Sequence, residues 1–232
     1  MAAPIEDYAL LSDLHTGPLI SRHGSVDWLC FPRFDSPSVF ASLLGQEDHG
    51  RWLLAPSPAE AVVVDRRYVD STFVLQTTWQ TNSGKVLVTD FMPVGGVHPS
   101  LVRRVTGLSG TVSMHQEIRI RPQYATVLPW VSRIRDSIDA SAEIHLAMSG
   151  PDALSLRGTC LPQAEDHRHA GEFTVQQGQN VDFHLTWFHS YQDVPPAIDI
   201  DESLDDTTLY WTTWAANCRY DGPIREQSSV HS

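Results

Sequence analysis

The stretch STFVLQTTWQTNSGKVLVTDFMPV, residues 71–94, contains two runs of strand-forming residues on either side of one tight turn. In the first run, odd positions carry the apolar residues Phe73, Leu75 and Trp79, whereas the even positions from 76 to 80 are polar. A period of two places one face against a core and the other in solvent, as in an antiparallel sheet. Asn82-Ser83-Gly84 then supplies the glycine that a tight hairpin turn favours. This stretch therefore predicts a β-hairpin.

The same alternation recurs along the chain. It is clear in EIHLAM, residues 143–148, and in VDFHLTW, residues 181–187, and a second turn signal lies at residues 177–180. Roughly a dozen short strands at such spacing are typical of a large β-sandwich. We therefore predict an all-β fold, a large antiparallel β-sandwich that occupies residues 1–200.

Two segments depart from the strand pattern. Ser36-Pro37 offers an N-cap and a first-turn proline, and an apolar stripe then runs to Gly45, which predicts a short helix near 37–45. Acidic residues crowd the start of residues 201–218, where a helix dipole favours them. One face of this second predicted helix carries Leu204, Thr208, Trp211, Trp214, Ala215 and Cys218. Such a face must pack, either on the sheet or on a further domain.

The charge balance limits the classes of partner. The chain of 232 residues has 28 acidic residues against 16 Lys and Arg, a formal net charge of -12. This balance argues against nucleic acid and against an anionic membrane surface, because both need a basic face. No apolar run approaches the about 18 residues of a membrane span, and MAAPIEDYAL lacks the basic start and apolar core of a signal peptide. We expect a cytoplasmic protein without a membrane partner.

Neither a cofactor nor a metal is expected. Cys30, Cys160 and Cys218 are widely spaced and odd in number, which favours reduced, mostly buried thiols. The cluster Asp166-His167-Arg168-His169 lies in a polar segment and is interpreted as a solvated turn, since no further ligands follow at a recognised spacing.

The run GSVDWLCFPRFDSPSVFASLLG, residues 24–45, places charged residues among aromatics and prolines. In a structural interpretation, Arg33 and Asp35 form a partly buried ion pair that fastens the turn, with Asp27 as a further acceptor. In a functional interpretation, the same loop faces a neighbouring domain or a sugar, on which its aromatic residues stack. The residues alone leave both interpretations open, with the structural one favoured.

The sequence carries no strong signal of a catalytic site. No Gly-x-Ser-x-Gly, His-Glu-x-x-His or phosphate-binding glycine loop occurs. A glycosidase needs two carboxylates, about 5 Å apart for retention and about 6.5–9.5 Å apart for inversion. Asp27, Asp35, Asp90 and Asp139 are available, but a structural role is favoured for each of them.

Three segments nevertheless carry a resemblance to a known family. They are IEDYALLSDLHTGPLISRHGSVDWLCFPRFDSPSVFASLLG (5–45), RRYVDSTFVLQTTW (66–79) and VTDFMPV (88–94). Together they resemble the N-terminal domain of bacterial glycoside hydrolase family 15 proteins, the glucoamylase- and trehalase-like enzymes. The later Leu209-Tyr210-Trp211-x-x-Trp214 and Tyr220-x-Gly222-Pro223 resemble the segment that leads into the catalytic barrel of that family.

The resemblance implies a β-supersandwich followed by an (α/α)6 barrel that inverts the configuration of α-glucosides. Both catalytic glutamates of the family lie in the barrel, so no catalytic residue is expected in this chain. The expected domains are a sandwich over 1–200, a helix and linker over 201–223, and the start of the barrel over 224–232. The barrel is the expected partner, and an α-glucoside or a second copy of the chain are further candidates. The residues expected to face the substrate or the barrel are Asp27, Trp28, Arg33, Phe34 and Asp35, and those expected between domains are Trp211, Trp214 and Tyr220.

The alternative is a stand-alone β-sandwich that binds carbohydrate or assembles subunits. One departure from the family concerns residues 123–127. Where the family continues with an Arg-Phe-Asp-Tyr-Gly-like run, this chain has Gln-Tyr-Ala-Thr-Val, without the arginine, the acid and the turn glycine. We expect this change to affect any contact that the loop makes with a substrate or a neighbouring domain.

Overall fold

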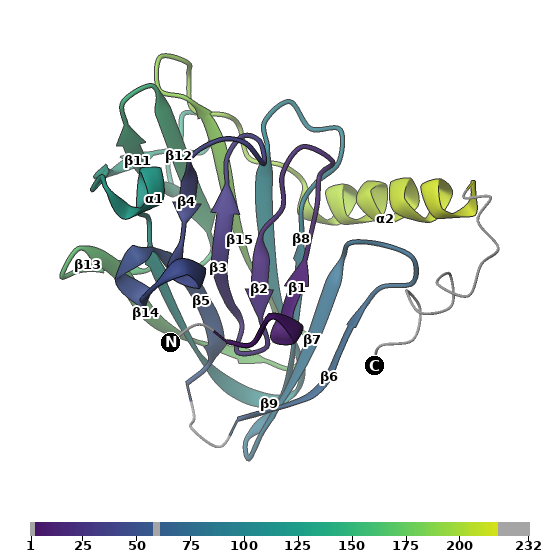
Figure 1. Ribbon diagram of the computed structural model, residues 1–232. Helices are drawn as coiled ribbons and strands as arrows, with labels where there is room; N and C mark the ends of the chain where they lie inside the picture. Colours follow the sequence, from purple (N-terminus) through teal and green to yellow (C-terminus); the bar gives the residue numbers. More distant parts are fainter. Residues whose placement is uncertain (1–2, 58–60, 218–232) are drawn as a thin grey trace.

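The computed structural model describes residues 3–57 and 61–217, which form a β-sandwich of two antiparallel layers with one long helix outside it (Figure 1). The strands are β1 (Tyr8–Leu10), β2 (Leu19–Ser21), β3 (Ser25–Cys30), β4 (Ser38–Phe40), β5 (Arg51–Pro56), β6 (Val62–Tyr68), β7 (Leu75–Thr81), β8 (Gly84–Phe91), β9 (Ser100–Arg119), β10 (Trp130–Arg135), β11 (Glu143–Ser149), β12 (Asp152–Gly158), β13 (Gln163–Glu165), β14 (Arg168–Gln176) and β15 (Asn180–His189). The helices are α1 (Pro122–Ala125), α2 (Ile200–Ala216) and the 3-10 turns Ile5–Asp7, Ser42–Leu44 and Glu47–His49. The predicted all-β fold and the predicted hairpin of β7 and β8 are confirmed.

Strand β9 belongs to both layers. Its first half pairs with β8 and β15 in the sheet ordered β6-β7-β8-β9-β15-β12-β11-β10, which we call the first sheet. Its second half pairs with β5 and β14 in the second sheet, ordered β1-β2-β3-β5-β9-β14-β13. The change occurs near Gly107 and Gly110, where the pairing with β8 shifts register and Gly110 has a φ of +63°. The twenty-residue strand therefore joins the layers covalently, and it replaces what the sequence pattern suggested were shorter strands.

The space between the layers is filled by apolar side chains from both sheets. Trp52 of the second sheet meets Phe183 of the first edge to face, with ring centroids 6.5 Å apart. Arg103 is fully buried in this core and crosses it. Its guanidinium donates to Asp90 in the first sheet, to the backbone oxygen of Trp52 in the second sheet and to that of Gly24 in the β2–β3 turn, each at 2.8 Å. A charged side chain thus ties the two layers together.

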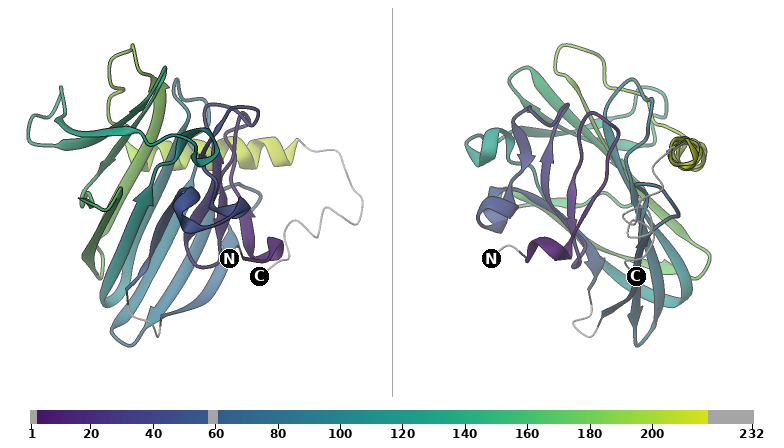
Figure 2. Two further views of the ribbon diagram at one scale, coloured as in Figure 1. Left: turned by 60° about the vertical axis from the view of Figure 1, so that its left-hand side comes forward. Right: turned by 45° about the vertical axis from the view of Figure 1, so that its right-hand side comes forward.

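Helix α2 lies against the outer face of the first sheet, as the end-on view in Figure 2 shows. Asp199 caps its first turn by accepting hydrogen bonds from the backbone N–H groups of Asp201 and Glu202. Leu204 packs on a small apolar cluster of the sheet, and Trp211 is 3% exposed against Phe73, 4.7 Å between ring centroids. The predicted C-terminal helix is therefore confirmed, with the sheet as its packing partner.

The helix predicted near 37–45 is wrong. Residues Ser38–Phe40 form strand β4, which pairs with the end of β3, and only Ser42–Leu44 make a 3-10 turn. Pairing with β3 satisfies backbone groups that a short helix would leave without partners, so tertiary context overrides the local helix signal.

The cluster Asp166-His167-Arg168-His169 forms the tip of a hairpin. Asp166 and His167 occupy the turn between β13 and β14 with positive φ, while Arg168 and His169 already belong to β14. Within the described residues no group of three or more His, Cys, Asp or Glu side chains is arranged to hold a metal ion. In the same ranges no helix has the length and apolarity needed to cross a membrane.

Candidate functional site

The loop after β3 and the loop after β9 meet at one end of the sandwich. The backbone N–H of Arg121 donates to the Val39 oxygen at 3.0 Å, and that of Tyr124 donates to Ser38 Oγ at 3.1 Å. The rings of Trp28 and Tyr124 lie 6.1 Å apart. The family-like run of residues 24–45 and the divergent run of residues 123–127 therefore form one site.

The loop after β9 contains a left-handed turn without glycine. Gln123, Tyr124 and Ala125 have φ values of 56°, 56° and 64°. Each such residue costs about 1–2 kcal/mol because its Cβ approaches a carbonyl oxygen. Local hydrogen bonds hold the turn: Thr126 donates to the Gln123 oxygen through its N–H at 3.2 Å and its hydroxyl at 2.7 Å. Backbone strain of this kind occurs preferentially at functional sites, and here it presents Tyr124 half exposed to solvent.

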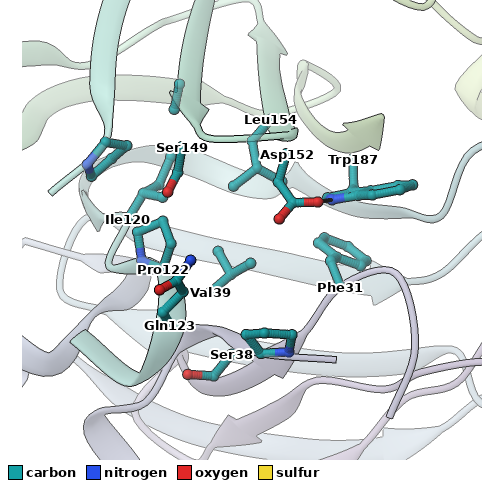
Figure 3. Close-up of a pocket in the computed structure, with 13 residues that line it drawn as sticks. Phe31, Ser38, Val39, Ile120, Pro122, Gln123, Ser149, Asp152, Leu154 and Trp187 are labelled. Atoms are coloured by element: carbon teal, nitrogen blue, oxygen red, sulfur yellow. Dashed lines mark hydrogen bonds between the residues drawn. The ribbon is translucent and has the colours of Figure 1, made fainter. Parts of the chain in front are cut away.

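A small cavity lies where the two loops meet the sheets (Figure 3). Its volume is about 30 Å³, far below the 300–1,000 Å³ that is typical of small-molecule sites. Figure 3 shows Asp152 beside Trp187, whose indole N–H donates to it at 3.2 Å, with Phe31 nearby. The remaining walls include Val39, Ile120, Pro122, Gln123 and Leu154. This cavity has no room for a sugar ring, so any carbohydrate contact would use the outer surface of the loops.

The outer surface of the two loops is rich in aromatic residues. Phe34 is 56% exposed, Tyr124 is 51% exposed and Trp130, at the start of β10, is 74% exposed. Leu128 next to Trp130 is exposed as well. We call these four residues the loop surface. Exposed large apolar side chains of this kind are suited to a protein interface or to stacking on a sugar.

The predicted ion pair forms, but its predicted burial is wrong. Arg33 Nε donates to Asp35 Oδ1 at 2.9 Å, and the two side chains are 69% and 74% exposed. The turn points outward because its backbone bonds close on themselves, with the Ser36 N–H donating to the Arg33 oxygen at 3.1 Å. The Phe34 N–H ties the turn to the His15 oxygen at 2.9 Å. The pair therefore lies on the surface rather than against the sheet.

Asp27 is held away from this pair. It accepts hydrogen bonds from Tyr8 Oη at 2.7 Å and from Ser25 Oγ at 2.5 Å. Burial and the bond to Asp27 raise the pKa of Tyr8, so the phenol stays protonated and remains the donor. The expectation that Asp27 is a further acceptor for the Arg33–Asp35 pair is therefore wrong, and its structural role is to accept from Tyr8 and Ser25.

The other two candidate acids also have structural partners. Asp90 pairs with buried Arg103 at 2.8 Å. Asp139 accepts from the N–H of Ser141 at 3.0 Å and from its hydroxyl at 2.5 Å, which closes a surface turn. These bonds lower the pKa of Asp139, the hydroxyl bond most strongly.

The residues predicted to lie between domains divide into three cases. Trp211 is buried on the sheet, and Trp214, 6.0 Å from it between ring centroids, is 56% exposed. Tyr220 lies outside the described residues. Helix α2 and turn α1 lie on different sides of the sandwich in Figure 1 and in the right-hand view of Figure 2. The structure therefore brings Trp28 together with Tyr124 and leaves the exposed Trp214 on another face.

Sequence reasoning did not select Tyr124 or Arg121 as site residues. The only signal for Tyr124 was the departure of residues 123–127 from the family run. Arg121 follows Arg119 at the end of β9, where charged and apolar residues alternate, and it is only 9% exposed. The close approach of β4 and the following loop covers it.

Comparison with known proteins agrees with this architecture. The family described as "Trehalase-like, N-terminal" matches residues 1–158. A trehalase from Mycolicibacterium smegmatis is 46% identical over 186 residues, which is 79% of this chain and 25% of that protein. A trehalase from Mycobacterium tuberculosis is 32% identical over 241 residues, 91% of this chain and 34% of that protein. The chain thus spans a quarter to a third of the length of these relatives.

A solved structure shares the fold. It is a bacterial glucoamylase complexed with acarbose, with a TM-score of 0.63 and 9% sequence identity, matched over 98% of this chain and 39% of that one. At this identity the likeness concerns the fold alone. The family match covers more than half of the chain and the resemblance that the sequence carried is confirmed, so this chain belongs to the trehalase-like N-terminal domain family.

Proposed function

We propose that the chain works as the non-catalytic N-terminal module of a longer glucoamylase- or trehalase-type hydrolase that cleaves an α-glucoside with inversion. Its relatives are named trehalases, and it matches a quarter to a third of their length. In this proposal the sandwich covers residues 1–200, residues 201–223 lead to the catalytic barrel, and residues 224–232 begin it. The protein acts in the cytoplasm.

The loop surface is the part of the module that shapes the mouth of the active site. The single observation that carries this role is the contact of the β9–β10 loop with strand β4, where the Tyr124 N–H donates to Ser38 Oγ at 3.1 Å and the side chains of Tyr124 and Trp130 are exposed. Arg33 and Asp35 lie on the exposed turn before β4 and keep each other oriented at 2.9 Å. Loops held by a scaffold in this way are suited to binding. Exposed Trp214 on α2 supplies a separate contact with the barrel.

The test compares the chain of residues 1–232 with the same chain extended by the sequence that follows it in its gene. We expect the chain alone to fold and to hydrolyse neither trehalose nor maltose, and the extended protein to hydrolyse one of them. In the extended protein, Tyr124→Ala should lower kcat/KM for the substrate, whereas Arg67→Ala, on a distant edge strand, should leave it unchanged. Normal kinetics in Tyr124→Ala would restrict the loop surface to a structural role.

A second candidate is a stand-alone carbohydrate-binding sandwich, which the exposed aromatic residues of the loop surface favour. One measurement distinguishes this candidate from the first. The chain alone would then bind a maltodextrin through Tyr124 and Trp130, and extension of the chain would add no hydrolysis.

A further inference from the structure

A second cavity among the described residues borders the loop surface at Leu128. It has a volume of about 350 Å³ and lies between the loop after β9, the start of β10 and the β13–β14 hairpin. This volume is within the range of small-molecule sites. Its apolar wall comes from Ile118, Ile120 and Val131, and its charged wall from Arg121 and Arg168.

The two arginines differ in their partners. Arg168 is neutralised by Glu117 at 2.7 Å and by Glu165 at 3.3 Å. Arg121 is 9% exposed and donates one hydrogen bond, from Nη1 to the Ile120 oxygen at 3.0 Å. Among the described residues no carboxylate forms an ion pair with it. Asp48, the acid that attracts it, is already bound to Arg119.

Within the described ranges, Arg121 lacks the ion-pair partner that a mostly buried arginine normally has. Buried charges are normally paired, because removal from water is not otherwise compensated. Burial lowers the pKa of Arg121, and the nearby charge of Arg119 lowers it further. A planar guanidinium with unused donors on a cavity wall is suited to bind a carboxylate through two parallel hydrogen bonds.

The remaining walls narrow the class of ligand. Leu128, together with the apolar wall, favours a hydrophobic body over a fully hydrated inorganic ion. Glu165, Asp166, His167 and His169 also line the cavity, and the two acidic charges oppose a dianion more strongly than a monoanion. We propose that this cavity is a binding site for a small organic monocarboxylate, whose carboxylate pairs with Arg121 and whose apolar part lies on Ile118, Ile120 and Val131.

Benzoate is a suitable probe. Titration of the 1–232 chain at neutral pH, followed by amide chemical shifts in NMR spectra, should give saturable shifts at the residues that line the cavity. Arg121→Gln should weaken benzoate binding by about tenfold or more, since a hydrogen bond to a charged group contributes about 1.5–3 kcal/mol. The matched control Arg67→Gln removes an arginine from β6, at the opposite edge of the first sheet, and should bind benzoate like the unmodified chain.

Two further ligands test the class. Sulfate, a dianion without an apolar body, and benzyl alcohol, which lacks the carboxylate, should each bind about tenfold more weakly than benzoate. Absence of saturable shifts with benzoate, equal binding by Arg121→Gln, or equal binding of sulfate would each overturn the proposal.

A second variant covers the case in which Arg121→Gln does not fold. Ala164 lines the cavity from an exposed position on β13, so Ala164→Phe fills the cavity without entering the core. It should abolish benzoate binding while the spectrum of the rest of the protein is kept. Unchanged benzoate affinity in folded Ala164→Phe would place the binding elsewhere and refute the site.

Discussion

Replacement of Arg103 by methionine tests how the two layers are held together. Arg103 is fully buried, its side chain lies over the Trp52 ring at 5.2 Å, and its partner Asp90 has a 2% exposed side chain. Methionine keeps most of the apolar stem but removes every donor. Asp90 then remains as a buried carboxylate without its ion-pair partner, because no other described residue forms an ion pair with it.

The magnitude follows from that unpaired acid. Removal of one partner of a buried pair costs about 3–5 kcal/mol. The Gly24 oxygen still accepts from the Leu54 N–H at 3.0 Å, so the loss of its hydrogen bond from Arg103 adds little to this cost. Because domains of this kind are stable by about 5–15 kcal/mol, Arg103→Met should remain folded but lose a large share of its stability.

The assay is urea unfolding followed by tryptophan fluorescence, with the free energy of unfolding extrapolated at constant slope. The matched control is Arg67→Met, which breaks a pair with Asp65 at 2.8 Å in which Arg67 is 60% exposed. Exposed pairs contribute about 0–1 kcal/mol, so this variant should unfold almost like the unmodified chain. The double variant Arg103→Met, Asp90→Leu removes both charges and should recover at least about 2 kcal/mol of the loss. A cost below about 1 kcal/mol for Arg103→Met, or a double variant no more stable than the single one, would refute this account of the core.

Three further predictions concern pH, the helix and the surface loop. Burial lowers the pKa of His184 to about 4, with a smaller effect from Arg157, so between about 4 and the ordinary 6.5 the unfolded chain binds a proton that the folded chain does not. His184 should therefore contribute a fall in stability of up to about 3 kcal/mol as the pH drops through this window. His184→Gln should make the profile of urea midpoints between pH 7.5 and 4.5 shallower but not flat, because burial also lowers the pKa of His145 to about 4. Trp211→Ala should cost about 3–5 kcal/mol in urea unfolding, while Trp214→Ala should change stability by less than about 0.5 kcal/mol; equal costs would show that α2 does not pack as described. Arg33→Ala should lower the unfolding free energy by less than about 1 kcal/mol, because its ion pair is exposed, and a loss above about 2 kcal/mol would contradict that exposure.

The loop surface illustrates how far the candidate site was predictable. The run of residues 24–45 was selected because charged residues between aromatics and prolines are unusual, and Arg33 does bond Asp35. Its meeting with Tyr124 was not predictable, since residues far apart in the chain carry no local mark of contact. The exposure of the ion pair was predicted wrongly because burial depends on where the strand ends relative to the sheet.

The sequence by itself determined those features of the fold that have a local cause. Alternating apolar residues produced the strands of residues 75–91, and acids at its start marked α2. Such signals depend on neighbours one to four positions away, so they are visible along the chain. The turn is at Asn82-Ser83 as expected, but Gly84 does not supply a positive φ: it begins β8, where a Cβ would clash with the Ser109 backbone oxygen.

Only the tertiary structure decided how these elements share space. It turned residues 38–40 into a strand, because pairing with β3 satisfied their backbone groups better than a short helix. It also let β9 pass from one sheet to the other and buried Arg103 between them, where Asp90 and two backbone oxygens compensate the charge. An arginine in a strand looks solvated from its sequence, and only the partners that the fold brings to it allow it to be buried.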